Sequence, residues 1–213
     1  MSQEFLFHNF KNIGFAQYKF TDDQLLPVRK EIDDIKKGFI TNHEPANNLL
    51  AGNIEKEYYL KDSHNHLEQL IMPLIATYES IFEYGTTINI MEHSYPVKLD
   101  KPWVNFQKKG EFNPNHNHSG VYSFVLYINI PYMIEDEMKN KSGVLSNRNI
   151  PAHFEFTFTN TLGGINTNSI AVDKTYENTI LIFPAKMVHC VYPFYTSDDY
   201  RISISGNFAL NIS

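Results

Sequence analysis

Residues 115–130 read NHNHSGVYSFVLYINI, two histidines one residue apart that run directly into a long apolar segment. The apolar segment, residues 121–130, predicts a β-strand. Side chains at positions i and i+2 of an extended chain point to the same face. His116 and His118 can therefore converge on one point, as two imidazoles that bind one metal ion must.

Short β segments separated by turns surround this strand. In His153–Thr159 the phenylalanines occupy every second position, which makes one face of the segment apolar. The predicted strands are residues 88–91, 103–108, 121–130, 153–159, 169–172, 179–183, 188–192 and 200–208. Eight short strands in about 120 residues favour a double-sheet jelly roll.

The first 86 residues have a different pattern, which predicts two helices. Thr21 and Gln24 have the spacing of a capping box, and apolar residues three or four apart follow them. Pro27 leaves open whether this helix begins at Thr21 or near Pro27 itself. A second helix is predicted after Ser63. We expect an α+β, mainly β protein that is one compact domain, with residues 1–86 packed on a β core of residues 87–213.

Composition limits the classes of partner and compartment. The chain has 213 residues, with 18 Lys and Arg against 24 Asp and Glu, a formal net charge of −6. This balance argues against a general binder of long nucleic acid. Cys190 is the single cysteine, so no disulfide framework exists and a reducing, cytoplasmic setting is expected. No signal peptide or membrane span is expected.

Two further segments carry candidate site residues. His189 lies where one apolar strand ends near Pro184 and another begins. Arg201 and Ser203 share one face of a strand whose other face is apolar. A guanidinium binds a carboxylate through two hydrogen bonds, and it is costly to bury unless it meets an anion. That anion is either a ligand or an Asp or Glu at the sheet edge.

The order of these motifs resembles the 2-oxoglutarate/Fe(II)-dependent oxygenases, especially a branch that is common in phage genomes. The resemblance covers about residues 101–208. It implies a double-stranded β-helix (jelly roll) with N-terminal helices packed on the larger sheet. The matching motifs are Trp103-Val104-Asn105, His116-Asn117-His118, Phe183-Pro184 with His189, and Arg201-Ile202-Ser203 followed by Gly206-Asn207-Phe208.

The resemblance also implies cofactors and a reaction. Fe(II) would be held by His116, His118 and His189, and 2-oxoglutarate by Arg201 and Ser203. The enzyme would use O2 to hydroxylate an unknown substrate, with release of succinate and CO2, in the host cytoplasm if the chain is encoded by a phage. Further candidates for the cosubstrate pocket are Asn105, Tyr122 and Tyr127. The two tyrosines are five positions apart on one strand, so at most one of them can serve.

The sequence departs from this family in one position. The usual motif is His-x-Asp/Glu, which gives two histidines and one carboxylate on iron, whereas His118 stands in the acidic position. Either the site has three histidines, or a carboxylate such as Glu155 or Asp136 completes it. Two alternatives therefore stay open: a three-histidine zinc or cupin-like metalloenzyme, and a non-enzymatic jelly-roll structural or binding protein.

Overall fold

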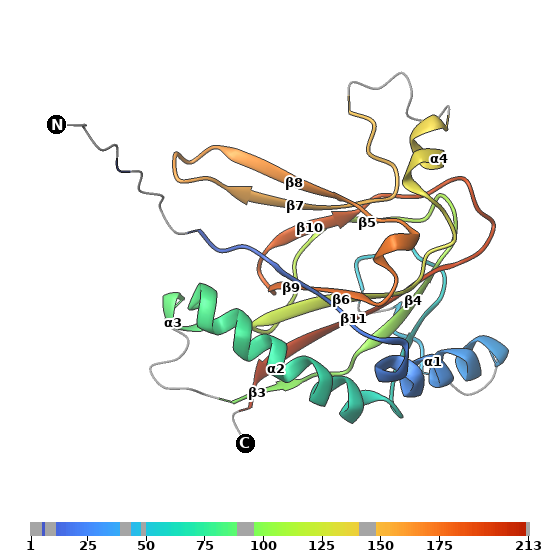
Figure 1. Ribbon diagram of the computed structural model, residues 1–213, viewed down its shortest axis with the longest axis horizontal. Coiled ribbons are helices and arrows are strands. Elements are labelled where there is room, and N and C mark those ends of the chain that lie inside the picture. The colour runs from blue at the N-terminus through green and yellow to red at the C-terminus, as the bar shows by residue number, and fades with distance from the viewer. Residues whose placement is uncertain are drawn as a thin grey trace.

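The structure, a computed structural model, describes residues 6, 12–38, 44–47, 50–88, 96–140 and 148–211. Two antiparallel sheets face each other, and helices cover the outer face of the larger sheet (Figure 1). Within the described residues, no helix combines the length and the apolar character needed to span a membrane. The predicted fold class is confirmed.

The larger sheet has seven strands in the order β1-β9-β6-β11-β4-β2, and β3 pairs with β11 as well. Its last strand in the sequence, β11, lies at the centre between β6 and β4. The strands of this sheet are β1 (Ala16–Lys19), β2 (Glu57–Tyr59), β3 (Val97–Leu99), β4 (Trp103–Gln107), β6 (Tyr122–Asn129), β9 (Thr179–Pro184) and β11 (Arg201–Leu210).

The smaller sheet has four strands in the order β5-β10-β7-β8. These strands are β5 (Asn113–His116), β10 (Val188–Val191), β7 (His153–Thr159) and β8 (Ile165–Ala171). The helices of the described chain are α1 (Asp22–Lys37), α2 (His64–Phe82), α3 (Tyr84–Thr87) and α4 (Ile134–Lys139), with one 3₁₀ turn at Lys174–Tyr176.

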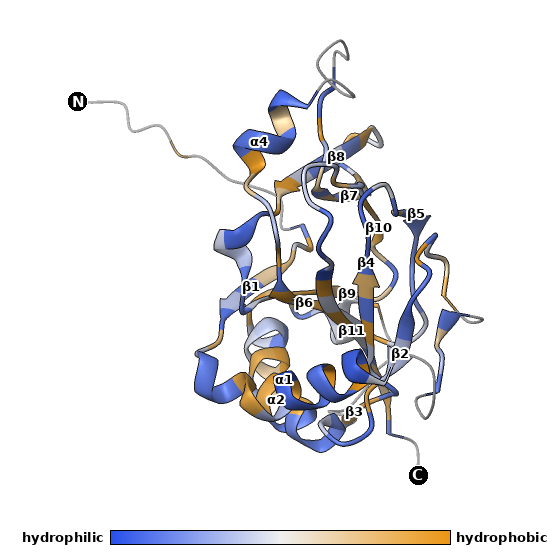
Figure 2. Cartoon of the chain, turned by 90° about the vertical axis from the view of Figure 1, so that its right-hand side faces the viewer, coloured by the Kyte–Doolittle hydropathy of each residue, from blue (hydrophilic) through white to orange (hydrophobic). Residues whose placement is uncertain are grey.

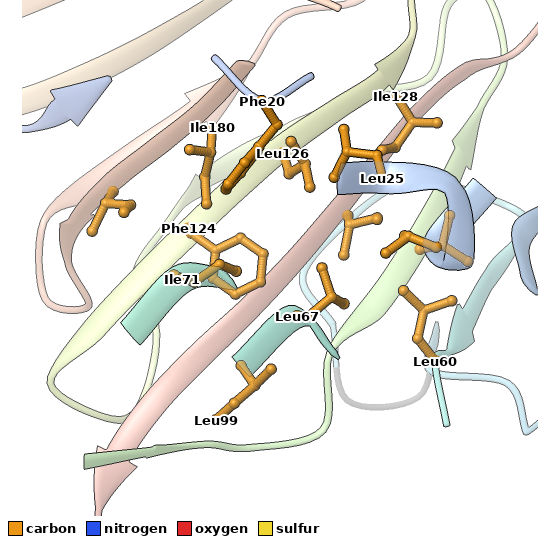
Figure 3. Close-up of a cluster of buried hydrophobic side chains, with 14 of the residues drawn as sticks. Phe20, Leu25, Leu60, Leu67, Ile71, Leu99, Phe124, Leu126, Ile128 and Ile180 are labelled. Carbon is orange, nitrogen blue, oxygen red and sulfur yellow. The ribbon is translucent and has the colours of Figure 1, made fainter. Parts of the chain in front are cut away.

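Alternation along the central strands creates two hydrophobic cores. Phe124, Leu126 and Ile128 of β6 point to α1 and α2 and form the outer core with Leu25 and Ile71 (Figure 3). The residues between them, among them Val125 and Tyr127, face the smaller sheet and form the inner core. Figure 2 shows hydrophobic residues concentrated in these central strands and in the two long helices. Burial on both faces explains why the β6 sequence is apolar almost throughout.

The start of α1 is set by its own sequence. The Thr21 side chain accepts from the Gln24 backbone N–H, and the Gln24 side chain accepts from the Thr21 backbone N–H, which is a complete capping box. The helix therefore begins at Asp22 and holds Pro27 inside it, and the alternative start near Pro27 is wrong.

The segment that leads into α2 is held by a side chain of α1. Ser63 makes no capping hydrogen bond through its side chain to the helix. Instead the buried Glu31 carboxylate of α1 accepts from the backbone N–H groups of Lys61, Asp62 and Ser63 at 2.7, 3.0 and 2.8 Å. An anion at this end also interacts favourably with the helix dipole. The two helices are thereby joined by a polar contact as well as by their apolar faces.

The longer predicted strands agree with the structure, and the short ones were missed. The predicted ranges for β4, β6, β7, β9, β10 and β11 match to within two residues at each end, whereas β8 begins earlier, at Ile165. Strands β1, β2, β3 and β5 have three or four residues each and were not predicted. Of the strand predicted at residues 88–91, only Ile88 is described, and it caps α3.

Candidate active site

A cavity that opens to solvent lies between the two sheets. Its walls come from strands of both sheets and from residues 50–57 of the N-terminal part of the chain. All three candidate histidines, Arg201 and Ser203 line it. The sequence segments that were singled out separately therefore meet in one place.

His116, His118 and His189 converge at this cavity. His116 ends β5 and lies directly opposite His189 on β10, and the backbone N–H of His118 donates to Ala185 at 2.8 Å. The ring centroids are 4.3 to 5.1 Å apart. One nitrogen from each ring lies within 4.8 Å of the others, a spacing that suits three ligands of one metal ion.

Hydrogen bonds and burial prepare these rings for metal binding. The Nδ1 atoms of His116 and His189 lie 2.7 and 2.9 Å from the carbonyl oxygens of Pro114 and Met187. A carbonyl only accepts, so each Nδ1 carries the proton and each Nε2 presents a lone pair. Burial lowers the pKa of all three rings, that of His118 to about 4 and that of His189 to about 3. The neutral form that binds metal is therefore the form present at pH 7.

Neither carboxylate suggested as a further ligand lies at this cluster. Glu155 alternates with the inward-facing Phe154 and Phe156 on β7, and it pairs with Arg148 and Ser169 instead. Asp136 lies on α4 and forms an exposed ion pair with Lys139 at 3.7 Å. Both suggestions were wrong, and the metal-ligating group found among the described residues consists of three histidines.

Arg201 is buried in the cavity wall, with 2% of its surface exposed. Its guanidinium donates to the Gln107 side chain, the Tyr132 hydroxyl and the carbonyl oxygens of Tyr192 and Ala152. All these acceptors are neutral. No Asp or Glu of the described chain forms an ion pair with it, so the alternative of a structural salt bridge is wrong for these residues. The cavity thus holds a positive charge without a counter-ion.

Asn105 and Ser203 form one hydrogen-bonded layer of the same wall. The Asn105 Nδ2 atom lies 3.3 Å from the hydroxyls of both Ser203 and Ser205, and its Oδ1 accepts from the Trp103 indole at 3.1 Å. Asn105 and Ser203 are direct neighbours across β4 and β11. The two predicted residues are therefore positioned together beside Arg201.

Only one of the two candidate tyrosines reaches the cavity. The Tyr127 hydroxyl is buried without a hydrogen-bond partner among the described residues, although its ring lines the cavity. Burial raises its pKa, so the hydroxyl keeps its proton and remains a donor. Tyr122 lies on the other face of β6, in the outer core, and donates to Glu79 at 2.6 Å. Its inclusion among the pocket residues was wrong.

Among the cavity residues that were not predicted are Gln107, Glu57 and Asn113. Gln107 is two residues after Asn105 on the predicted strand 103–108, so strand alternation could have identified it. Glu57 reaches the cavity because β2 pairs with β4, which places it opposite Asn105. Asn113 reaches it through an irregularity in β5. Neither of the last two placements has a signal in the sequence.

The comparison with family models identifies one family. Residues 101–207 match the model of a family described as "Putative 2OG-Fe(II) oxygenase". No curated protein matches the chain. A prolyl-4-hydroxylase from Pseudomonas putida has a similar structure, with 13% identity, a TM-score of 0.54 and coverage of 93% of this chain and 94% of that one.

Two other solved structures have the same fold. An oxidoreductase of the 2OG-Fe(II) oxygenase family from Burkholderia pseudomallei has 13% identity and a TM-score of 0.51, over 92% of this chain and 85% of that one. A prolyl hydroxylase from Trichoplax adhaerens, in complex with a hypoxia-inducible factor peptide, has 12% identity and a TM-score of 0.51, over 92% and 83%.

Proposed function

The chain belongs to the 2OG-Fe(II) oxygenase family. On this basis we propose that the protein hydroxylates a substrate, with Fe(II) held by its three histidines and 2-oxoglutarate held by Arg201. Membership of this family implies two cofactors, Fe(II) and 2-oxoglutarate. It also argues against the non-enzymatic jelly-roll alternative.

One observation carries the assignment of 2-oxoglutarate: within the described part of the chain, a buried guanidinium without a counter-ion shares a cavity with a hydroxyl that has no hydrogen-bond partner. Arg201 and Tyr127 both line this cavity, and Tyr127 lies opposite Ser203 on the neighbouring strand. A carboxylate placed there would neutralise the charge of Arg201 and accept a hydrogen bond from Tyr127. One carboxylate would thus supply the counter-charge that Arg201 lacks and the acceptor that the Tyr127 hydroxyl lacks, so the residues present fit 2-oxoglutarate.

The three histidines and Phe154 have the remaining proposed roles. The Nε2 atoms of His116 and His189 and a ring nitrogen of His118 would bind the metal, and the bonds from Nδ1 to backbone carbonyls fix two of the rings. Phe154 stacks on His189 at a centroid distance of 5.2 Å and limits access of water. When bound, Fe(II) and 2-oxoglutarate supply oxidising chemistry that consumes O2 and releases succinate and CO2.

Cys190 takes no part in this proposal. It alternates with His189 on β10, and burial raises the pKa of its half-buried thiol. The neutral thiol is a poor nucleophile and a poor metal ligand. With this single cysteine and a reduced metal, we propose that the protein works in the reducing cytoplasm.

The test is a titration of the Fe(II)-loaded protein with 2-oxoglutarate under nitrogen. The metal-to-ligand absorption band is the signal that reports binding. Arg201→Ala should keep stoichiometric Fe(II) and bind 2-oxoglutarate about 30- to several thousand-fold more weakly, because one partner of a desolvated charge pair is lost. Arg201→Lys should recover part of the affinity, since a point charge cannot reproduce the guanidinium fork.

Arg29→Ala is the matched control. Arg29 donates to Ile128 and Asn178 on the outer side of the large sheet, so its loss affects stability but not the cavity. The control should bind 2-oxoglutarate as the unchanged protein does. If Arg201→Ala only lowers the melting temperature and leaves the absorption band unchanged, the assignment is wrong. A protein that binds Zn(II) but shows no 2-oxoglutarate band would instead be a three-histidine zinc protein.

A further inference from the structure

Residues 50–57 and the start of β5 form one wall of the cavity. This wall carries two hydrogen-bond acceptors, side-chain oxygens of Glu57 and Asn113, that have few hydrogen-bond donors among the described residues. We propose that this wall, which we call the acceptor wall and which consists of Gly52, Glu57 and Asn113, recognises a cationic nitrogen of the substrate, of the primary alkylammonium type. The inference rests on the proposed function and names a substrate class for the same site.

The first acceptor is placed by a β-bulge. Across β5 and β10, His116 pairs with His189 and Asn113 pairs with Val191, so three steps on β5 match two on β10. The extra residue turns Asn113 toward the face that carries His116, although an odd separation normally places two residues on opposite faces. Both side chains line the cavity as a result. The Asn113 Oδ1 atom is buried and has no hydrogen-bond partner among the described residues.

The absence of a side chain at residue 52 gives this oxygen its position. A Cβ atom built on Gly52 would lie 2.3 Å from Asn113 Oδ1, far closer than two such atoms approach. The same point lies 3.4 Å from Glu57 Oε1. The two oxygens are therefore within about 5.7 Å of each other, the sum of these distances. One ammonium nitrogen that donates to both at about 2.9 Å holds its two acceptors about 4.7 Å apart, a separation within this upper limit.

The second acceptor is a buried carboxyl group without a cation. Glu57 is 1% exposed, and its side-chain partner is the Asn47 amide, which donates to Oε2 at 3.3 Å. No Lys, Arg or His of the described chain pairs with it. Burial, together with the nearby Glu111, raises the pKa of Glu57 to about 7. An ammonium group would supply both the missing positive charge and the missing donors.

The remaining lining of this region suits an alkyl chain. Leu50, Ile54 and Trp103 line the cavity together with the acceptor wall. Apolar side chains around a small number of polar groups are the usual composition of a small-molecule site. A ligand with a charged nitrogen at the end of a short hydrocarbon chain matches both parts.

Trp103 provides a direct readout because it is the sole tryptophan of the chain and lines the cavity. The experiment uses protein loaded with Fe(II) and 2-oxoglutarate under nitrogen, at pH 8 and constant ionic strength. Tryptophan fluorescence is followed during titration with n-butylammonium, with neutral 1-butanol and with anionic butyrate. We expect a saturable change with n-butylammonium alone.

Two variants and one control test the residues. Glu57→Gln should weaken n-butylammonium binding at least ten-fold, and Asn113→Asp should tighten it, because the wall gains a negative charge. Glu55→Gln removes the same charge from an exposed side chain that pairs with Lys108 at 2.6 Å, and it should change binding less than two-fold. Equal responses to all three probes, or unchanged binding by Glu57→Gln, would overturn the inference.

The 2-oxoglutarate absorption band, recorded in the same samples, separates this inference from the proposed function. A normal band without n-butylammonium binding overturns the acceptor wall and leaves the oxygenase assignment standing. Binding of n-butylammonium that depends on Glu57, in a protein without the band, overturns the oxygenase assignment instead.

Discussion

Two charged side chains of the cavity, Glu57 and Arg201, are buried without an opposite charge among the described residues. Burial of an unpaired charge lowers the stability of a folded protein. Both groups lie where a ligand of opposite charge is proposed, the carboxylate of 2-oxoglutarate at one and an ammonium at the other. The same unpaired charges thus lower the stability of the ligand-free protein and favour ligand binding.

The stability cost of Glu57 should depend on pH. Its pKa rises from 4.5 in the unfolded chain to about 7 in the fold, so between these values the unfolded state releases the proton and the folded state keeps it. The free energy of unfolding should therefore fall as pH rises through this window, by on the order of 3 kcal/mol in total. Glu57→Gln should lack this fall and be the more stable protein at pH 7.5. Urea unfolding of both proteins without ligands, from pH 4.5 to 7.5, checks this, and parallel curves would contradict it.

His189→Ala should abolish stoichiometric Fe(II) binding and leave the fold intact, because it removes one of three neutral ligands. His153→Ala is a matched control, since the Nδ1 of His153 also bonds a carbonyl two residues earlier, that of Pro151 at 2.7 Å, but it does not line the cavity. Anaerobic equilibrium dialysis with Fe(II) measures both. Unchanged Fe(II) binding in His189→Ala would remove it from the metal site.

At this scale the sequence predicted the residues that depend on strand alternation alone. His116, His118, His189, Arg201 and Ser203 were found because each lies at or near a recognisable strand. Asn113 was missed because β5 was not predicted and because its place also depends on a bulge, and Glu57 was missed because its place depends on the pairing of β2 with β4. The choice between the two tyrosines of β6 was open because both faces of that strand are buried.

Among the elements, α2 is distinctive because its N-terminus depends on a side chain of α1. Glu31→Gln removes the negative charge and one of the two oxygens that accept the N–H groups of Lys61, Asp62 and Ser63. We expect the free energy of unfolding to fall by roughly 1–3 kcal/mol, with no change in affinity for 2-oxoglutarate. Asp33→Asn, the same charge change on an exposed position of α1, should leave stability nearly unchanged. Equal stability of the two variants in urea unfolding would show that the contacts of Glu31 with residues 61–63 contribute little.

The elements that were predicted are those whose secondary structure is determined by their own local sequence. The capping box of α1 and the long apolar run of β6 each specify their element without help from the rest of the chain. Strands of three or four residues, such as β2 and β3, carry too few positions to show a period. They are strands because the edge of an existing sheet offers them hydrogen-bond partners.

At the scale of the molecule, the proposed ligands connect the two sheets. The metal would bind to His116 and His189 of the smaller sheet, and 2-oxoglutarate to Arg201 of the larger sheet. Under nitrogen, Fe(II) with 2-oxoglutarate at a hundred times its dissociation constant should add about 2.7 kcal/mol beyond Fe(II) alone. For a chain of this size that is a rise of about 5–10 °C in the melting temperature. Arg201→Ala should show the Fe(II) increment and lose the other, and an equal rise in that variant would contradict the proposal.

The central position of β11 determines when the larger sheet can be completed during synthesis of the chain. Residues 201–210 pair with β6 on one side and with β4 and β3 on the other, yet they are the last strand of the described chain to leave the ribosome. Until then the inner edges of β4 and β6 have no partner and are open to pairing with other chains. Until β11 is made, Arg201 is absent from the cavity, so a nascent chain holds His116 and His118 well before it holds the residue proposed to bind 2-oxoglutarate.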